Sequence, residues 1–272
     1  RAAGHTVLTL TRRAADDPGD VSWDVERGTI DAGALEGVEA IVHLAGESIG
    51  QRWSPSAREK ILRSRVDGTG LLARTAASLG SKPAFVQASA VGFYGPDNPV
   101  ADESTSRGRG FAAEVVEAWE EAAAPARDAG LRWVALRKAP IIAKDGGAVA
   151  QMLTPFKLGL GGRVGSGRQW WSWVSLEDAV RAYVHALETE LDGPLDVSAG
   201  AVTNAEFVKA LGRAIHRPTV FPLPAFAVKT MFGQMGEEML LGGQRVVSER
   251  LRQSGFSFRH ETLDEALDAA LA

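Results

Sequence analysis

A glycine-rich segment between residues 156 and 180 combines residue types that can hold an anionic ligand. Five glycines and three cationic side chains are followed by three tryptophans. Glycine lets backbone approach a ligand closely, arginine binds phosphate or carboxylate through two N–H groups, and indole rings offer faces for stacking. We therefore expect a loop closing over substrate, with contacts from Lys157, Arg163, Arg168 and Trp170. The alternative is a structural loop whose tryptophans fill the core and whose arginines face solvent.

A basic cluster follows the first predicted strand, at residues 7–10. Ligands of open α/β sheets bind beyond the carboxyl ends of the strands, where an acidic residue holds the ribose hydroxyls of NAD. Here Thr11, Arg12 and Arg13 occupy that place. Cationic side chains favour the additional 2′-phosphate of NADP. A solvated surface pair is the alternative.

The second predicted strand leads into HLAGE at residues 43–47. The small residues after it, Leu44, Ala45 and Gly46, allow an adenine and its ribose to lie against the backbone. The overlapping sequence GESIG matches the G-x-S-x-G elbow of α/β hydrolases, with Ser48 as nucleophile. That elbow needs a helix directly after the serine, whereas the helix start signal lies later, at Ser54 and Pro55. The hydrolase hypothesis is therefore the least favoured.

Two more strand ends supply candidates for catalysis and for a cofactor wall. SAVGFYG at residues 89–95 places Ser89 and Tyr94 where their hydroxyls could hydrogen-bond a substrate oxygen. A turn with a structural aromatic residue is the alternative. After the fourth strand, Pro140 and Ile141 can form a wall for a nicotinamide ring.

Strand and helix signals alternate along the chain, which predicts a parallel sheet wrapped by helices. Short apolar runs predict strands at residues 7–10, 40–45, 84–88, 133–136 and 195–197. Ser54 and Pro55 start one helix, and others are expected at residues 68–79 and 110–129. Capping boxes begin helices at Ser175, Thr203 and Thr262, the first of them running through Glu188. Helices dominate from about residue 195 onward.

Composition narrows the classes of function. The chain has 272 residues, 45% of them hydrophobic, with a net charge of −4 and no cysteine. These values give no reason to expect nucleic-acid or membrane partners, and five scattered histidines show no metal-ligand spacing. We expect a cytoplasmic, metal-free protein, a monomer or homodimer, that binds a small-molecule substrate.

At these motifs the chain resembles the extended short-chain dehydrogenase/reductase superfamily, and within it an atypical subfamily named as NAD(P)-dependent or nucleoside-diphosphate-sugar epimerases. The marks are HLAGE, Arg52-Trp53, Ser64-Arg65, SAVGFYG, DGGA at residues 145–148, the segment 156–173 and GGQR at residues 242–245. The resemblance implies a Rossmann fold that binds NADP. By position it adds Arg65 and Ala88 to the cofactor contacts and Glu47, Arg52 and Trp53 to the substrate side, and it places Ser89 at the catalytic serine or threonine.

The chain departs from that family in two places. The usual opening strand and its glycine-rich turn, which cradle the pyrophosphate, would lie upstream of Arg1. Residues 1–4 read instead as the end of a helix with a glycine stop, so we expect a truncated N-terminus, weak cofactor binding and an unpaired strand. The catalytic Tyr-x-x-x-Lys is replaced by Phe111 and Val115. The ordinary proton transfer cannot run there, and Tyr94 or Glu114 are the substitutes on offer.

We therefore expect an α/β protein with a Rossmann-like, doubly wound parallel sheet and a smaller, mainly helical C-terminal subdomain. The division would be residues 1–190 for NAD(P) binding, including a substrate loop at 145–174, and residues 191–272 on the substrate side. The expected function is that of an NADP-binding oxidoreductase or epimerase with an unknown substrate, possible substrates including nucleotide-sugars. A non-catalytic NADP-binding sensor or scaffold is the alternative.

Overall fold

The computed structural model describes residues 4–13, 17, 19–97 and 100–272. A four-stranded parallel sheet forms its centre, in the order β10 (Gly193–Val197), β7 (Trp133–Lys138), β5 (Ala84–Ala90), β4 (Ala40–His43). Three of these strands begin at the residue predicted from their apolar runs. β5 and β7 continue two residues further than expected, and the added residues include the polar Ser89, Arg137 and Lys138. β10 pairs with β7, so the sheet extends beyond the expected boundary at residue 190.

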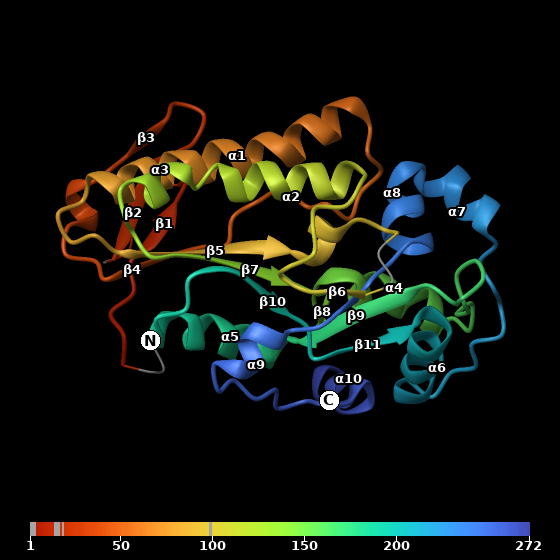
Figure 1. Ribbon diagram of the computed structural model, residues 1–272. Helices are drawn as coiled ribbons and strands as arrows, with labels where there is room; N and C mark the ends of the chain where they lie inside the picture. Colours follow the sequence, from red (N-terminus) through yellow and green to blue (C-terminus); the bar gives the residue numbers. More distant parts are fainter. Residues whose placement is uncertain (1–3, 14–16, 18, 98–99) are drawn as a thin grey trace.

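Helices cover both faces of this sheet (Figure 1). α1 (Pro55–Ser78), α2 (Phe111–Glu121) and α3 (Ala124–Asp128) lie on one face, and α5 (Leu176–Glu188) lies on the other. Ser54 caps α1 through the Ala57 N–H, with Pro55 in the first turn, as the sequence predicts. The expected separate helix at residues 68–79 is part of α1, because buried packing of its glycines outweighs their helix-breaking tendency. The helix expected at 110–129 is divided, since Pro125 cannot continue α2.

A second, small sheet contains the N-terminal strands. β1 (Thr9–Thr11) pairs parallel with β2 (Asp20–Asp24), which pairs antiparallel with β3 (Thr29–Ile30) ahead of the short helix η1 (Gly33–Leu35). β1 thus begins two residues later than expected. Within the described ranges, no strand pairs with the edge of β4 that faces away from β5. Residues 1–3 of the predicted helix end lie outside the described residues, and the expectation of a missing opening strand stays a prediction.

The tryptophan segment forms a strand, which corrects the expectation of a loop spanning residues 145–174. β9 (Trp170–Ser175) lies between β8 (Ile141–Ile142) and β11 (Gly200–Thr203), and α4 (Gly147–Lys157) precedes it. Burial on both faces explains the strand, because its last four residues are all buried and the neighbours Trp173 and Val174 both belong to the core. Helical spacing explains α4, whose Val149, Leu153 and Phe156 are buried together.

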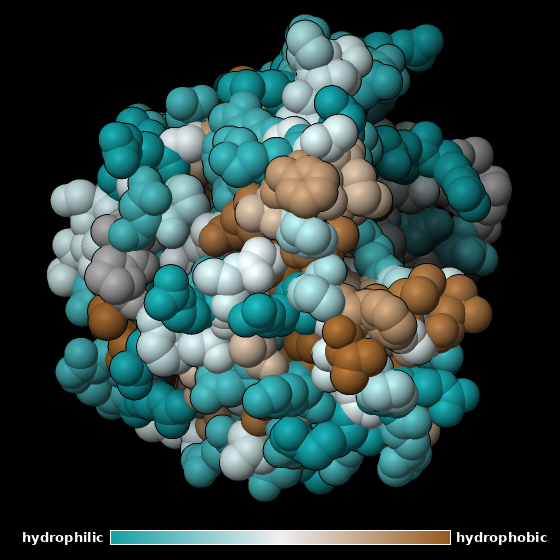
Figure 2. Space-filling view, turned by 90° about the vertical axis from the view of Figure 1, so that its right-hand side faces the viewer, coloured by the Kyte–Doolittle hydropathy of each residue, from teal (hydrophilic) through white to brown (hydrophobic). Residues whose placement is uncertain are grey.

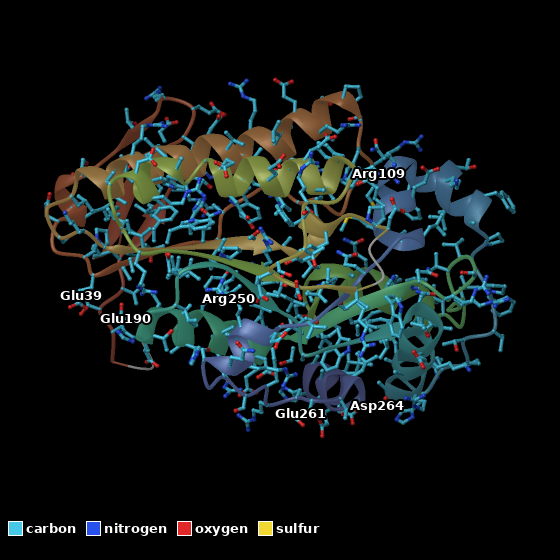
Figure 3. The ribbon with its side chains drawn as sticks, in the orientation of Figure 1. Glu39, Arg109, Glu190, Arg250, Glu261 and Asp264 are labelled. Atoms are coloured by element: carbon cyan, nitrogen blue, oxygen red, sulfur yellow. The ribbon has the colours of Figure 1, made fainter. Side chains whose placement is uncertain are left out.

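Helices dominate the C-terminal region, as predicted. They are α6 (Asn204–Ala214), α7 (Ala225–Phe232), α8 (Gln234–Gly236), the π-helix η3 (Glu237–Leu241), α9 (Glu249–Gln253) and α10 (Leu263–Leu271). Two short elements follow β5, the helix η2 (Val91–Tyr94) and the strand β6 (Val100–Ala101), which pairs with β12 (Arg245–Val246). The capping boxes predicted at Thr203 and Thr262 are both present. An ion pair between Arg213 and Asp264 joins α6 to α10 at the periphery (Figure 3).

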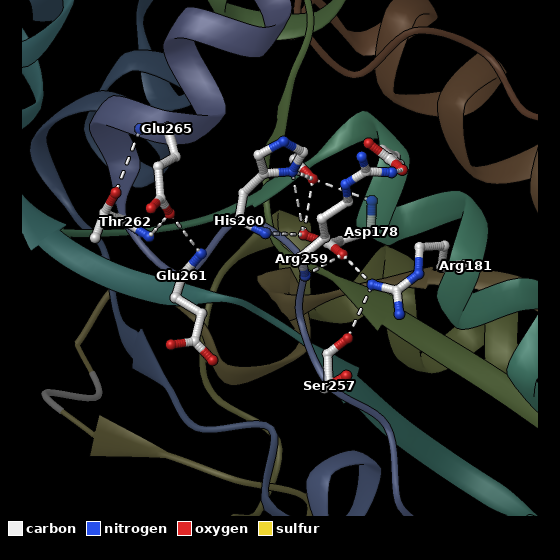
Figure 4. A network of polar contacts seen from close by, with 10 residues as sticks. Asp178, Arg181, Ser257, Arg259, His260, Glu261, Thr262 and Glu265 are labelled. Atoms are coloured by element: carbon white, nitrogen blue, oxygen red, sulfur yellow. Dashed lines mark hydrogen bonds and ion pairs between the residues drawn. The ribbon is translucent and has the colours of Figure 1, made fainter.

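The C-terminal segment is fastened to the first turn of α5 through one buried carboxylate (Figure 4). Asp178 accepts hydrogen bonds from the backbone N–H groups of Arg259 and His260 and from the Arg181 side chain. Ser175 caps the helix and also donates to Asp178. Burial alone would raise the pKa of Asp178, but these hydrogen bonds hold it below its usual value. The carboxylate therefore fixes the C-terminal part against the sheet.

Candidate functional site

The carboxyl ends of β4, β5 and β7 bring together most residues predicted to contact a cofactor. Leu44 is 63% exposed directly after β4, an unusual position for a large apolar side chain. Ala45, Gly46 and Glu47 beside it are also exposed. Pro140 is exposed after β7, Ile141 is half-buried and Ala88 is buried in β5. The edge therefore offers an open apolar surface at the end of β4.

The predicted adenosine contacts lie at the end of β1, in the smaller sheet. Arg12 and Arg13 are exposed, and the Thr11 hydroxyl accepts a hydrogen bond from the Arg13 backbone N–H. Within the described part of the chain, neither arginine forms an ion pair with a carboxylate. Their guanidinium groups are thus available to an anion.

Ser89 belongs to a buried charged network on the face of the sheet covered by α2. Its hydroxyl donates to Glu120 Oε1 over 2.6 Å, and the same carboxylate forms a two-pronged pair with Arg137 at 2.8 and 2.7 Å. Ser89 is 2% exposed. The register explains the meeting, because Ser89 is paired with Arg137 across β5 and β7, and both point toward α2.

Tyr94 extends the same network. The residue is fully buried, and its hydroxyl donates to Asp196 Oδ2 over 2.8 Å and accepts from Arg137 Nη1 over 3.1 Å. Burial, reinforced by the neighbouring Glu103, raises the pKa of Asp196 to about 8. Burial also raises the pKa of Tyr94. Enclosure of both the Ser89 and Tyr94 hydroxyls favours a structural role, and their catalytic assignment stays a prediction.

Two residues expected to contact substrate have partners within the protein instead. Trp53 is buried against Phe111 and Ile61 and donates from Nε1 to the Ile49 carbonyl, which corrects its placement as a substrate contact. Arg52 is exposed, but Nη1 donates to the carbonyls of Thr230 and Met231 in α7. It therefore joins the loop after β4 to the C-terminal part.

The helix that carries the catalytic pair in the wider superfamily is capped here from another part of the chain. The Glu238 carboxylate accepts the N–H groups of Phe111 and Ala112 at the start of α2. Phe111 and Val115 are buried in the core, and Glu114 faces solvent. A carboxylate at a helix N-terminus satisfies unpaired donors and the helix dipole. This docking residue gave no recognisable signal in the sequence.

Two cations near the same edge have N–H donors that no acceptor among the described residues takes up. Arg65 is buried, and its Nη1 donates to the carbonyls of Glu47 and Ile61 while the guanidinium lies over the Trp119 ring. Lys138 ends β7, and its Nζ donates to the Ser89 carbonyl at 3.3 Å and to the Tyr183 hydroxyl at 2.9 Å. Burial, and then the charge of Arg65, lowers the pKa of Lys138 to about 7. The sequence reading missed Lys138 because it ended the strand at residue 136.

The predicted substrate lid lies at the end of the molecule formed by α4, α6 and α7. Lys157, Arg163 and Arg168 are exposed, and Trp170 is half-buried beneath the Arg245 guanidinium. Backbone hydrogen bonds tie this loop to residues 221–223. Apolar side chains gather on this end in Figure 2, and the exposed ones are Leu158, Leu160, Val220, Phe221, Phe226 and Met231. The loop is thus held in place by the C-terminal part.

The remaining predictions concern a hydrolase site and a metal site. The helix after Ser48 begins only at Pro55, so the hydrolase elbow is not formed. Two surface hollows, of about 630 and 570 Å³, lie beside α6 and between α1 and α3. Among the described residues, no helix is long and apolar enough to cross a membrane, and no three metal-ligating side chains gather.

Comparison with known proteins decides the family. The model of the "NAD dependent epimerase/dehydratase family" matches residues 1–200, and a "Domain of unknown function (DUF1731)" matches residues 223–270. The chain belongs to the NAD dependent epimerase/dehydratase family. This membership confirms the resemblance drawn from HLAGE, SAVGFYG and GGQR.

Relatives of this family member span nearly its whole length. The epimerase family protein ML0860 of Mycobacterium leprae is 42% identical over 99% of this chain and 89% of its own. The structure of human epimerase family protein SDR39U1 with NADPH is 34% identical, with a TM-score of 0.88 over 99% of this chain and 92% of that one. A nucleoside-diphosphate sugar epimerase of Corynebacterium glutamicum is 29% identical, with a TM-score of 0.79 over 98% of this chain and 53% of that one. The similarity confirms the Rossmann-like fold class.

Proposed function

We propose that this protein is an NADP-binding oxidoreductase or epimerase of the extended short-chain dehydrogenase type, acting on a small molecule. The observation that carries the proposal is the exposed Leu44 and the cation Arg65 at the edge of the parallel sheet, together with Arg12 at the end of β1, which forms no ion pair with a described carboxylate; these groups suit an anionic dinucleotide. Family membership supports a nicotinamide cofactor, and the human relative solved with NADPH supports NADP over NAD.

Different residues would contact different parts of the cofactor. Thr11, Arg12 and Arg13 would hold the adenosine 2′-phosphate, because guanidinium groups bind phosphate in a two-pronged way. Leu44, Ala45 and Gly46 would line the adenine ribose, while Arg65 would face the middle of the cofactor. Ala88, Pro140 and Ile141 would line the nicotinamide end. A bound nicotinamide would supply hydride transfer.

The substrate side is proposed to lie between Glu47 and the loop that carries Lys157, Arg163, Arg168 and Trp170. Glu47 is exposed, its carboxylate accepts a hydrogen bond from Gln51, and its charge acts on Arg65. We place the boundary between the cofactor-binding part and the C-terminal part of the chain after Val197, since β10 belongs to the parallel sheet.

Replacing Arg168 by alanine should weaken substrate affinity. Unchanged affinity and turnover would exclude the loop at residues 157–170 as a substrate lid.

A non-catalytic NADP-binding sensor is the second candidate function. The observation in its favour is the burial of Phe111 and Val115, at the positions of the missing tyrosine and lysine, and of the Ser89 and Tyr94 hydroxyls, whereas Glu114 faces solvent. Phe111 and Val115 lie in the core, and the hydroxyls of Ser89 and Tyr94 are enclosed in the network around Glu120 and Arg137. The sensor would bind NADPH without oxidising it in the presence of any carbonyl compound or nucleotide-sugar.

Fluorescence titration with NADPH and NADH tests the cofactor assignment. It should use this chain and a version extended upstream by the expected strand and glycine turn. Replacing Arg12 by alanine should lower NADPH affinity at least tenfold, because a hydrogen bond to a charged group contributes about 1.5–3 kcal/mol, and should leave NADH affinity unchanged. Arg27→Ala, another exposed arginine, is the control. Equal affinity for both cofactors would remove the NADP preference, and binding of neither would remove the nicotinamide proposal.

A further inference from the structure

Two segments of the chain contain cationic residues but no acidic residue. Neither residues 146–176 nor residues 207–236 include an aspartate or a glutamate, so all 34 acidic side chains lie elsewhere in the chain. The seven lysines and arginines of the two segments are Lys157, Arg163, Arg168, Lys209, Arg213, Arg217 and Lys229. The net charge of −4 for the whole chain does not reveal this local excess of positive charge.

Hydrogen bonds join the two segments at the end of the molecule formed by α4, α6 and α7 (Figure 1). The Phe221 N–H donates to the Gly161 carbonyl, and Leu223 forms two further backbone hydrogen bonds with the same loop. The Arg217 side chain donates from Nε to the Lys157 carbonyl over 3.0 Å. The cations of both segments therefore lie at the same end of the molecule.

Most of this positive charge is not neutralised within the described part of the chain. Three of the seven cations act on a neighbouring carboxylate. The four exposed cations that form no ion pair with a described carboxylate are Lys157, Arg163, Arg168 and Arg217. Arg217 and two more of the seven, together with His216, line the hollow of about 630 Å³ beside α6. A hollow with cationic walls suits a phosphate group.

The same two segments expose large apolar side chains, which gather on this end of the molecule (Figure 2). Phe226 is 73% exposed and Leu158 is 71% exposed, and Leu160, Val220, Phe221 and Met231 are exposed as well. None of these six side chains lines either of the two hollows. A peptide or helix from a protein partner docks into an apolar groove, whereas a lipid bilayer accepts side chains that protrude from a surface.

A second copy of this chain is a poor partner for this surface. A two-fold axis would place the same patch on both subunits and bring the unpaired cations of one copy toward those of the other. An anionic partner instead neutralises them. The combination of exposed apolar groups with unpaired cations is typical of surfaces that bind anionic membranes.

We propose that the surface formed by residues 157–168 and 216–231 binds an anionic lipid bilayer. Phe221, Phe226 and the exposed leucines would enter the headgroup region, and the unpaired cations would contact lipid phosphates and carboxylates. The inference goes beyond the proposed function and does not depend on the cofactor. Because the loop at residues 157–170 also carries the proposed substrate contacts, the test alters residues outside that loop.

Cosedimentation of the full chain with lipid vesicles measures this binding. The vesicles consist either of phosphatidylcholine alone or of phosphatidylcholine mixed with phosphatidylserine. We expect binding only to the vesicles that contain phosphatidylserine. Raising the salt concentration from about 0.1 to 1 M should weaken it, because the screening length falls from about 10 to 3 Å.

Three variants identify the surface, each shown to be folded by circular dichroism. Phe221→Ala combined with Phe226→Ala should weaken vesicle binding about tenfold or more, because their apolar area no longer leaves water. Arg217→Gln should weaken it about fivefold, the effect of one cation near an anionic membrane. Leu176→Ala combined with Val180→Ala is the control, since these exposed side chains lie on α5, and it should bind as tightly as the native protein.

The outcomes separate this inference from the proposed function. Absence of binding to both kinds of vesicle, equal binding to both, or equal losses in the two double variants would each refute the membrane surface. NADPH titration of the same preparations is independent of these results. If the protein binds phosphatidylserine vesicles and not NADPH, the membrane surface stands and the cofactor proposal fails. If it binds NADPH and no vesicles, the cofactor proposal stands and the membrane surface is refuted.

Discussion

Two groups of ionisable side chains lie at the ends of β5 and β7, on opposite faces of one sheet. On the α2 face, Glu120 binds Arg137 through two hydrogen bonds and also accepts from Ser89. On the α5 face, the described hydrogen-bond partners of Lys138 are neutral, and its pKa is lowered by burial and by the charge of Arg65. The first group is neutralised by an ion pair, whereas no described carboxylate forms an ion pair with Lys138. Arg65 itself interacts with the charge of Glu47.

This difference separates a charge that is paired within the core from one that is not. A buried pair with all its hydrogen bonds formed leaves an unpaired charge when one partner is removed. A buried cation without a carboxylate partner destabilises the folded protein while it is charged. Removing a residue from the first group should therefore cost stability, whereas removing the charge of Lys138 should not.

The largest expected effect is on the neutralised group. Glu120→Ala leaves Arg137 as an unpaired buried charge, and we expect the free energy of unfolding to fall by about 3–5 kcal/mol. Urea denaturation measures the loss. Asp67→Ala is the matched control, because its ion pair with Arg63 is exposed and contributes at most about 1 kcal/mol. Similar losses for both variants would contradict the structural role of Glu120.

Lys138→Met should act in the opposite direction on stability. The methionine fills the same partly buried space without a charge beside Arg65, and we expect the unfolding free energy to rise by about 1–3 kcal/mol. The sign follows from the pKa, which is lower in the folded protein than in the unfolded chain, so the charged lysine opposes folding at neutral pH. Thermal unfolding at pH 6 measures the change. A loss of stability would show that Lys138 is satisfied by its present partners.

His43 sharpens the comparison because it is buried and forms no ion pair with a described carboxylate. Its Nε2 atom has no hydrogen-bond partner in the described structure, and burial lowers its pKa to about 4. The native state therefore keeps it neutral, and stability should be lost as pH falls from 6.5 to 4. The loss approaches about 1.4 kcal/mol per pH unit. Comparing urea midpoints at pH 7 and 5 for the native protein and His43→Leu tests this. An equal change in both proteins would exclude His43 as the cause.

Much of the fold could be predicted from local sequence. The apolar runs located Ala40, Ala84 and Trp133 as strand starts, and the serine and threonine caps located α1, α6 and α10. The strand ends were missed because Ser89, Arg137 and Lys138 are polar, and only tertiary pairing explains their place in strands. The tryptophans were interpreted as part of a lid because the glycines and cations before them indicate a loop, whereas β9 forms through pairing with β8 and β11.

The candidate site, too, could be predicted from the sequence only in part. The motifs HLAGE and SAVGFYG correctly indicated the strand ends that form the edge. The partners of Ser89 could not be predicted, since Glu120 reaches it only through the packing of α2 against β5. The proximity of Arg65 and Lys138 likewise depends on how α1 and β7 are placed. Such pairs carry no local sequence signal.

The most direct test compares NADPH affinity in one variant of the exposed cations after β1 and one variant of the buried network. Fluorescence titration would use the native protein, Arg12→Ala and Ser89→Ala, each shown to be folded by circular dichroism. The account predicts that Arg12→Ala weakens NADPH binding about tenfold or more, the loss expected for a hydrogen bond to a charged group, while Ser89→Ala binds as tightly as the native protein. Weaker binding by Ser89→Ala together with unchanged binding by Arg12→Ala would contradict it.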